Sequence, residues 1–342
     1  MDNRSRRKSV SGTRVGRYLL GRVVGKGISS EVRLATDTSN GKLVALKIMQ
    51  KEWIYENDVG ALVQREIDIV RELDHPCVVK LVEVFNSEEH VFMAMEAVDG
   101  RDLHEELRRQ GRMGEARARG LFQQLMIAVE YLHSIGVAHR DIKLENALLS
   151  KDGARLCLAD FGLAARLDEW EDSSGGAGTQ AKLKKRRLPW RWNGKGGGRR
   201  GSQGRRQQSV SCGTPAYAAP EIITSSDEQR YDARGVDTWS AGVCLYAMVT
   251  GVLPFGGSKL EDTLEAIQTT EPKFPNHLSP LLLELLRGML RKDPAERMTV
   301  AAVVSHPWTT RMPDLNSPLQ RQQQRLSAAA GRRRQPLRLL RR

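Results

Sequence analysis

The periodicity of apolar residues changes once along this 342-residue chain, and that change constrains the fold more than any other feature. From Tyr18 to about Met95, apolar residues form short alternating runs, a pattern typical of β-strands. One stretch in this half, residues 59–73, has helical spacing instead, and the spacing stays helical from about Asp102 onward. The clearest helical stretches there are residues 115–135, 237–250 and 279–291. The sequence therefore predicts an α+β, bilobal fold, with a small antiparallel β lobe that holds one main helix and a larger, mainly helical lobe.

A short join near Glu96–Gly100 separates the two predicted lobes. Ligands commonly bind in a cleft of this kind. Residues 170–209 interrupt the helical half with Gly, Lys, Arg and Gln and almost no aliphatic residues, which predicts a long disordered insertion. The predicted organisation is a basic disordered N-terminus (1–17), a folded domain (18–308, divided into 18–97 and 98–308) and a basic disordered tail (309–342).

The net charge of +13 is distributed unevenly. Residues 1–17, 173–212 and 311–342 together carry +24, which leaves −11 for the rest of the chain. The basic charge thus lies in segments predicted to be disordered, and the predicted folded surface is acidic. An acidic surface attracts basic partners.

The cysteine pattern and the hydropathy exclude several classes of protein. Four cysteines lie far apart without a C-x-x-C pair, so we expect buried reduced thiols rather than a zinc site or a disulfide framework. No run approaches the roughly 18 apolar residues of a membrane span, and the N-terminus lacks the apolar stretch of a signal peptide. We expect a cytoplasmic protein, with a nuclear location left open.

Two features of the β half are consistent with phosphate binding. Gly25-Lys26-Gly27 opens a turn in which glycines let the backbone approach phosphates closely, although an ordinary glycine-containing hairpin explains it equally well. Lys47 lies within an apolar strand and needs an anionic partner, because burying a lone ammonium group is costly. Phosphate oxygens or Glu66 would serve, and a surface lysine with a buried stem is the alternative.

The most specific pattern is residues 139–146, His-Arg-Asp-Ile-Lys-Leu-Glu-Asn, followed by Asp160-Phe161-Gly162. These segments resemble the catalytic loop and the metal-binding motif of protein kinases, with Lys143 where serine/threonine-specific members have it. Ala219-Pro220-Glu221, after Gly213-Thr214-Pro215, resembles the kinase platform for peptide substrates. The resemblance covers about residues 18–308, with the motifs in order.

Within protein kinases, three segments resemble the group that contains the calmodulin-dependent and AMP-activated kinases. They are Leu73–Leu81, Cys212–Glu221 and Gly251–Phe255. The resemblance to this group implies transfer of the ATP γ-phosphate to serine or threonine hydroxyls of proteins. It implies ATP and Mg²⁺ as cofactors.

The kinase resemblance assigns a role to each residue of the site. Asp141 would accept the substrate proton, Lys143 would steady the transferring phosphoryl group, and Asn146 and Asp160 would bind Mg²⁺. Lys47, aligned by Glu66, would hold the α- and β-phosphates. The nucleotide contacts would be Gly25, Lys26, Gly27, Val32, Ala45, Lys47, Met95, Glu96, Val98, Asp102 and Leu148. The structural residues would be Thr214, Glu221 paired with Arg297, and Asp237 bracing the catalytic loop.

The same resemblance bears on regulation and substrate choice. In kinases of this type an arginine at the position of Arg140 often pairs with a phosphorylated activation loop, but the usual threonine is replaced here by Val210. We therefore expect phosphorylation of Ser209 or Ser211 by an upstream kinase, and Ser9 lies in a similar basic context. Asp102 and Glu145 stand where related kinases meet basic residues of the substrate. Basic substrates are therefore expected.

Alternatives stay open at this point. A pseudokinase scaffold is disfavoured because Lys47, Glu66, Asp141, Asn146 and Asp160 are all present. The basic insertion, with Lys184–Arg187, could bind nucleic acid, an acidic partner or the acidic surface of the kinase itself as an autoinhibitory segment. A solvated insertion without function is an equally good reading, and nucleic acid is a disfavoured partner that the sequence does not exclude.

Overall fold

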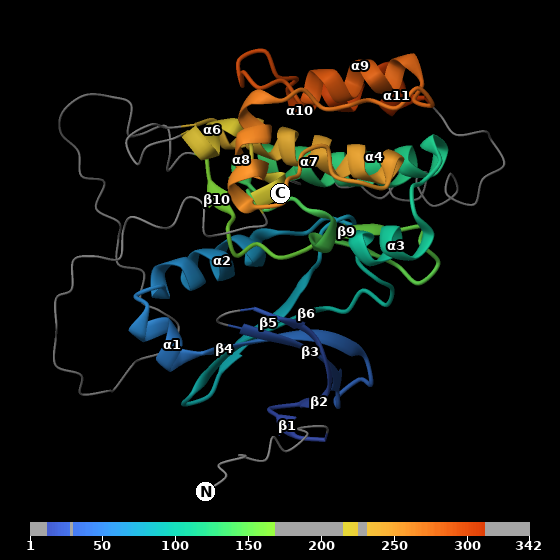
Figure 1. Ribbon diagram of the computed structural model, residues 1–342. Helices are drawn as coiled ribbons and strands as arrows, with labels where there is room; N and C mark the ends of the chain where they lie inside the picture. The colour runs from blue at the N-terminus through green and yellow to red at the C-terminus, as the bar shows by residue number, and fades with distance from the viewer. Residues whose placement is uncertain (1–11, 28–29, 168–214, 225–230, 312–342) are drawn as a thin grey trace, which may run out of the picture.

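The computed structural model describes residues 12–27, 30–167, 215–224 and 231–311. These residues form two lobes, one built on a β-sheet and one mainly of helices (Figure 1). The bilobal fold predicted from the sequence is therefore confirmed. No helix within these ranges is long and apolar enough to cross a membrane.

The small lobe is a six-stranded sheet in the order β1-β2-β3-β4-β6-β5, with every neighbouring pair antiparallel. Its strands are β1 (Arg14–Val15), β2 (Tyr18–Lys26), β3 (Ser30–Asp37), β4 (Leu43–Gln50), β5 (Leu81–Asn86) and β6 (His90–Glu96). Alternate residues point to opposite faces. Val44 and Leu46 of β4 pack with Tyr18, Phe92 and neighbours in a small apolar cluster on one face. The residues between them therefore point to the other face.

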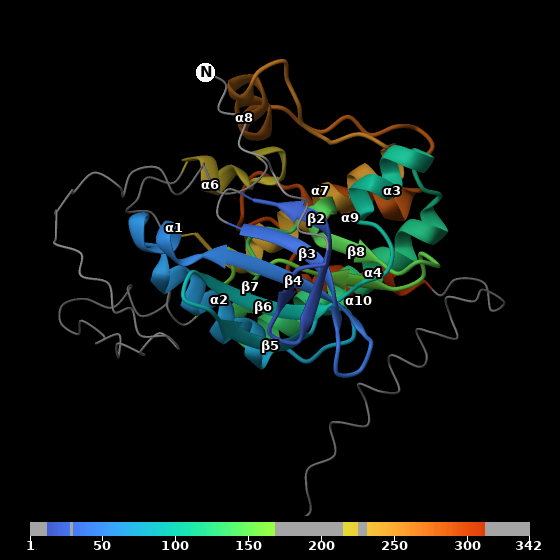
Figure 2. The same ribbon diagram turned by 90° about the horizontal axis from the view of Figure 1, so that it is seen from below.

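Two helices, α1 (Lys51–Glu56) and α2 (Gly60–Glu72), follow β4. The main helix, α2, has nearly the predicted bounds and buries Val63, Ile67 and Val70 in the main core. Leu62 of the same helix is 39% exposed. Figure 2 shows α1 and α2 beside each other at the same end of the sheet.

The sequence missed two short elements of this lobe. The predicted disordered N-terminus is wrong at Arg14–Val15, which pair with Leu19 and Tyr18 as strand β1. Helix α1 has only six residues and was not predicted. Elements this short hold too few residues to show a periodic pattern of apolar residues. Whether they form therefore depends on their contacts with neighbouring segments.

The large lobe is built around α4 and α7, which pack against each other and against α10. Its helices are α3 (Leu103–Gln110), α4 (Glu115–Ser134), α6 (Pro220–Thr224), α7 (Ala233–Thr250), α8 (Leu260–Thr269), α9 (Pro280–Met289), α10 (Val300–Ser305) and α11 (Pro307–Thr310). Two 3₁₀ turns are η1 (Leu144–Asn146) and η2 (Pro215–Tyr217). Because α11 continues to Thr310, the predicted tail begins two residues too early.

Two two-stranded antiparallel sheets accompany the helices. Strand β7 (Val137–Ala138) pairs with β10 (Ala165–Arg166), and β8 (Ala147–Leu149) pairs with β9 (Leu156–Leu158). The link from β6 to α3 lies against β8. A Cβ at Gly100 would overlap the carbonyl of Leu149. Glycine therefore permits this close approach of the two segments.

Candidate active site

Strand β4 presents Lys47 on the sheet face that looks toward the large lobe. Residues paired across antiparallel strands share a face, as do residues two apart in one strand. The register pairs Val32 with Lys47 and Ala45 with Met95. Gly25 pairs with Val32 on the next strand. Five of the residues that the sequence assigned to nucleotide contact, from four strands, thus lie on one face.

The Lys47 ammonium group joins the two lobes. Its Nζ lies 2.6 Å from Glu66 Oε1 on α2 and 3.3 Å from Asp160 Oδ1 in the large lobe. Burial alone would lower the pKa of Lys47, but the carboxylates of Glu66 and Asp160 raise it above its ordinary value. The Lys47 charge in turn lowers the pKa of Asp160. Lys47 and Asp160 are therefore charged at neutral pH.

Asp141 is fixed by two side chains of its own loop. Lys143 Nζ donates to Asp141 Oδ2 at 2.7 Å, and Asn146 Nδ2 donates to the same oxygen at 3.0 Å. Asn146 also donates to the backbone carbonyl of Asp141 at 2.8 Å. A carboxylate held by two donors points in a defined direction, which is what a proton acceptor in catalysis requires.

Helix α7 holds the backbone of this loop through Asp237. Its fully buried carboxylate accepts the N–H groups of His139 and Arg140 at 2.9 and 2.7 Å, and His133 Nε2 lies 2.8 Å away. Arg140 has φ +63°, a left-handed conformation that few non-glycine residues adopt. The two hydrogen bonds to Asp237 keep the loop in this strained turn.

Asn146 and Asp160 lie at the same end of the β8–β9 hairpin. Asn146 precedes β8, Asp160 follows β9, and Ala147 pairs with Leu158. Asp160 has φ +61°, and its carboxylate is half-exposed beside Lys47. The described residues hold no cluster of three or more His, Cys, Asp or Glu side chains suited to a metal. One carboxylate and one amide oxygen fit Mg²⁺, which takes most of its ligands from phosphates and water.

The burial and contacts of the predicted nucleotide residues differ from one to the next. Val32, Ala45, Met95 and Leu148 are partly buried, and Leu148 forms an isolated bridge with Asp102. The Asp102 carboxylate accepts the N–H of Glu105 at 2.7 Å and so caps α3. Lys26 is largely exposed and lies 3.9 Å from Glu31. Val98 lies in the linker between β6 and α3.

Sequence reasoning missed Arg155, which precedes β9. Its guanidinium group donates to both carboxylate oxygens of Glu96, at 2.7 and 3.4 Å, and to the carbonyl of Pro76 at 3.0 Å. The backbone N–H of Glu96 is bonded to the carbonyl of Lys80 at 2.8 Å. One arginine thus ties the start of the linker to the large lobe and to the loop after α2. One signal in the sequence points to this role: an arginine stands directly before the apolar residues Leu156–Leu158.

The pair of Glu221 and Arg297 forms as the sequence predicted. The two oxygens of Glu221 lie 2.6 and 2.8 Å from the two terminal nitrogens of Arg297, whose side chain is 1% exposed. Bidentate geometry of this kind gives the strongest carboxylate–arginine contacts. It holds α6 against the segment before α10. Thr214, Ser209, Ser211, Ser9 and the insertion 170–209 lie outside the described residues.

A family model described as "Protein kinase domain" matches residues 18–183 and 196–309 of the chain. The chain belongs to the protein kinase family. Residues 184–195, between the two matched stretches of this kinase, lie in the segment where the sequence loses its apolar periodicity.

Curated relatives of this kinase carry similar names. "CBL-interacting serine/threonine-protein kinase 17" of Arabidopsis thaliana is 33% identical over 299 residues, which cover 87% of this chain and 61% of the relative. "CBL-interacting protein kinase 31" of Oryza sativa subsp. japonica is 36% identical over 295 residues, which cover 86% of this chain and 58% of the relative. The chain thus spans about three-fifths of the length of these relatives.

Proposed function

We propose that this chain is a serine/threonine protein kinase, which transfers the γ-phosphate of ATP to hydroxyl groups of protein substrates. The observation that carries the proposal is the arrangement of six polar groups from distant segments. Lys47 meets Glu66 and Asp160, while Asp141 is held by Lys143 and Asn146. The names of the relatives support the serine/threonine class.

Each residue has a defined task in this proposal. Asp141 orients the attacking hydroxyl and accepts its proton, and Lys143 stabilises charge on the transferring group. Lys47 holds phosphate oxygens at a distance set by Glu66. Mg²⁺, when bound by Asn146 and Asp160, supplies neutralisation of phosphate charge. The protein contributes positioning and electrostatics rather than covalent chemistry.

A substrate with a basic residue near the target hydroxyl is the second part of the proposal. Glu145 lies next to Asn146 and is partly buried, and its carboxylate hydrogen-bonds with the side chain of Tyr217. Its negative charge stands beside Asp141 and Asn146 in the chain, where it would attract an arginine or lysine of the substrate. Asp102 offers weaker support, because its carboxylate already caps α3.

We further propose that this kinase falls in the group of the calmodulin-dependent and AMP-activated kinases, and that it has regulatory protein partners. The names of the relatives support the regulatory partners, since they state an interaction with CBL. The group assignment is supported by the segments Leu73–Leu81, Cys212–Glu221 and Gly251–Phe255. The sequence expectation of phosphorylation at Ser209 or Ser211 is retained as part of this proposal.

The test is a phosphorylation assay with radiolabelled ATP on a Ser/Thr peptide library. The unaltered kinase should label peptides, with preference for Arg or Lys before the target residue. Asp141→Asn and Lys47→Met should lower turnover by at least about 10²-fold, because each removes a group that acts in the transition state. If only acidic or proline-directed peptides were labelled, the proposed preference for a basic residue near the target hydroxyl would be contradicted.

Matched control variants separate catalysis from folding. Lys42→Met alters an exposed lysine next to β4, and Asp58→Asn alters an exposed aspartate after α1. Both should keep full turnover. Circular dichroism and thermal melting should show all four variants folded. Folded, nucleotide-binding protein without turnover would instead indicate a scaffold.

A further inference from the structure

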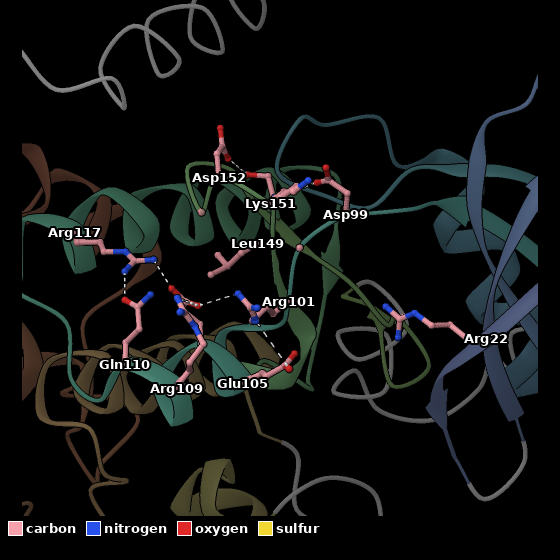
Figure 3. A pocket seen from close by; sticks show the side chains of 14 residues that line it. Arg22, Asp99, Arg101, Glu105, Arg109, Gln110, Arg117, Leu149, Lys151 and Asp152 are labelled. Atoms are coloured by element: carbon pink, nitrogen blue, oxygen red, sulfur yellow. Dashed lines mark hydrogen bonds and ion pairs between the residues drawn. The ribbon is translucent and has the colours of Figure 1, made fainter.

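A cavity of about 770 Å³ lies outside the proposed active site. It is bordered by α3, by the linker around Gly100, by the turn between β8 and β9, and by Arg22 of β2 (Figure 3). Its size is that of a ligand-binding pocket. Its lining is strongly charged. Some of the charged side chains are paired with one another within the wall, and others are not.

Glu106 of α3 is the buried acid of this cavity, with a side chain only 6% exposed. Arg117 donates to Glu106 Oε1 at 2.7 Å, and Arg109 lies 3.5 Å from Oε2. Burial alone would raise the pKa of Glu106, but the hydrogen bond and charge of Arg117 lower it. This carboxylate is therefore ionised and fully paired.

Two further carboxylates are also paired within the wall. Asp152 accepts the hydroxyl of Ser150 at 2.5 Å and the N–H of Ala154 at 3.0 Å. Asp99 accepts the N–H of Lys151 at 3.1 Å. Both acids thus shape the β8–β9 turn, and part of their capacity to bind a ligand cation is used.

The cationic groups are less well paired. Among the described residues, the side chains of Arg22, Arg101 and Lys151 make no hydrogen bond, although all three line the cavity. Arg101 only approaches Glu106 at 3.8 Å and the exposed Glu105 at 4.0 Å. Figure 3 shows the Arg22 guanidinium directed from β2 toward the linker that carries Arg101. In the lining of this cavity, hydrogen-bond donors without a partner among the described residues therefore outnumber acceptors without one.

We propose that this cavity is a docking site for an acidic segment of a regulatory partner protein, with Asp or Glu side chains bound by Arg22 and Arg101. Guanidinium groups match carboxylates in geometry. A polypeptide also offers backbone N–H groups to the exposed Glu105, whose ion pair with Arg101 is as long as 4.0 Å. A nucleic acid fits less well, because its continuous phosphates would face Asp99, Glu105 and Asp152. The binding needs no phosphotransfer, so its test is independent of the proposed function.

The experiment measures binding to the full chain carrying Asp141→Asn, by fluorescence anisotropy of a labelled ten-residue peptide of alternating Glu and Ala. Arg22→Ala with Arg101→Ala should weaken binding at least about tenfold, and 0.5 M salt should weaken it further. The control pair Arg108→Ala with Arg112→Ala removes equal charge from exposed positions outside the cavity. It should change the dissociation constant less than twofold. The proposal would be overturned if both double variants lost the same affinity for the peptide, or if neither lost any.

A second measurement locates the peptide. A benzophenone-bearing version should crosslink to α3, the linker or the β8–β9 turn, as mapped by mass spectrometry. Crosslinks confined to the basic segments 173–212 or 311–342 would refute the site. So would a single-stranded RNA oligomer that outcompetes the peptide and loses affinity with Arg22→Ala and Arg101→Ala.

Discussion

At the residue scale, Asp237 illustrates how neighbours fix the charge of a buried group. Burial would raise its pKa, but hydrogen bonds from His133 and the Arg140 backbone, with the nearby charge of His133 and His139, lower it below its ordinary value. The folded protein therefore stabilises the ionised form. The contribution to stability is full above the unfolded pKa of about 3.9 and is lost as the pH falls through the lower folded value.

Replacing Asp237 with Asn should therefore cost about 3 kcal/mol of stability at pH 7, since three donors lose a charged acceptor. Below about pH 4 the unaltered protein should lose stability more steeply than the variant, so the two curves converge. Urea unfolding at a series of pH values measures this. The exposed control Asp58→Asn should follow the unaltered protein, and parallel curves for Asp237→Asn would argue against the explanation.

At the element scale, Arg155 connects three segments that hold the linker. Strand β9, the end of β6 and the loop after α2 all meet at its guanidinium group. The kinase resemblance assigns nucleotide contacts to Glu96 and Val98 of this linker. Arg155 would then act as a positioning residue, by holding that backbone rather than touching the nucleotide.

Arg155→Gln should raise the KM for ATP about three- to tenfold and leave kcat within about twofold, because the contact lies outside the reacting atoms. Arg155→Lys keeps the charge without the bidentate geometry and should recover part of the loss. Steady-state kinetics with ATP varied gives both constants. A fall in kcat with unchanged KM would indicate a different role.

At the scale of the whole molecule, one charged cluster joins the lobes. Lys47 from the sheet, Glu66 from α2 and Asp160 from the large lobe meet within 3.3 Å of Lys47 Nζ. Phe161, next to Asp160 in the chain, packs against His139 with ring centroids 4.9 Å apart. A ligand that bridges this cluster would stabilise both lobes together.

A non-hydrolysable ATP analogue with Mg²⁺, at about 100 times its Kd, should stabilise the protein by about 2.7 kcal/mol. In a domain of this size that raises Tm by roughly 5 °C. Differential scanning fluorimetry measures the shift. Lys47→Met should reduce it strongly at the same concentration while Lys42→Met keeps it, and an equal shift in both would contradict the assigned role of Lys47.

The sequence by itself determined the lobes, the main helices and the residues that meet at the centre. Strand and helix periods are local properties, so α2, α4 and β4 could be predicted from spacing, and the order of the motifs indicated that Lys47, Asp141 and Asp160 converge. Tertiary structure alone decided strand β1, helix α1, the arginine contacts of Glu106 and the three contacts of Arg155. Those features depend on residues up to 79 positions apart whose side chains carry no periodic signal. Only the packed chain brings such residues within hydrogen-bond distance.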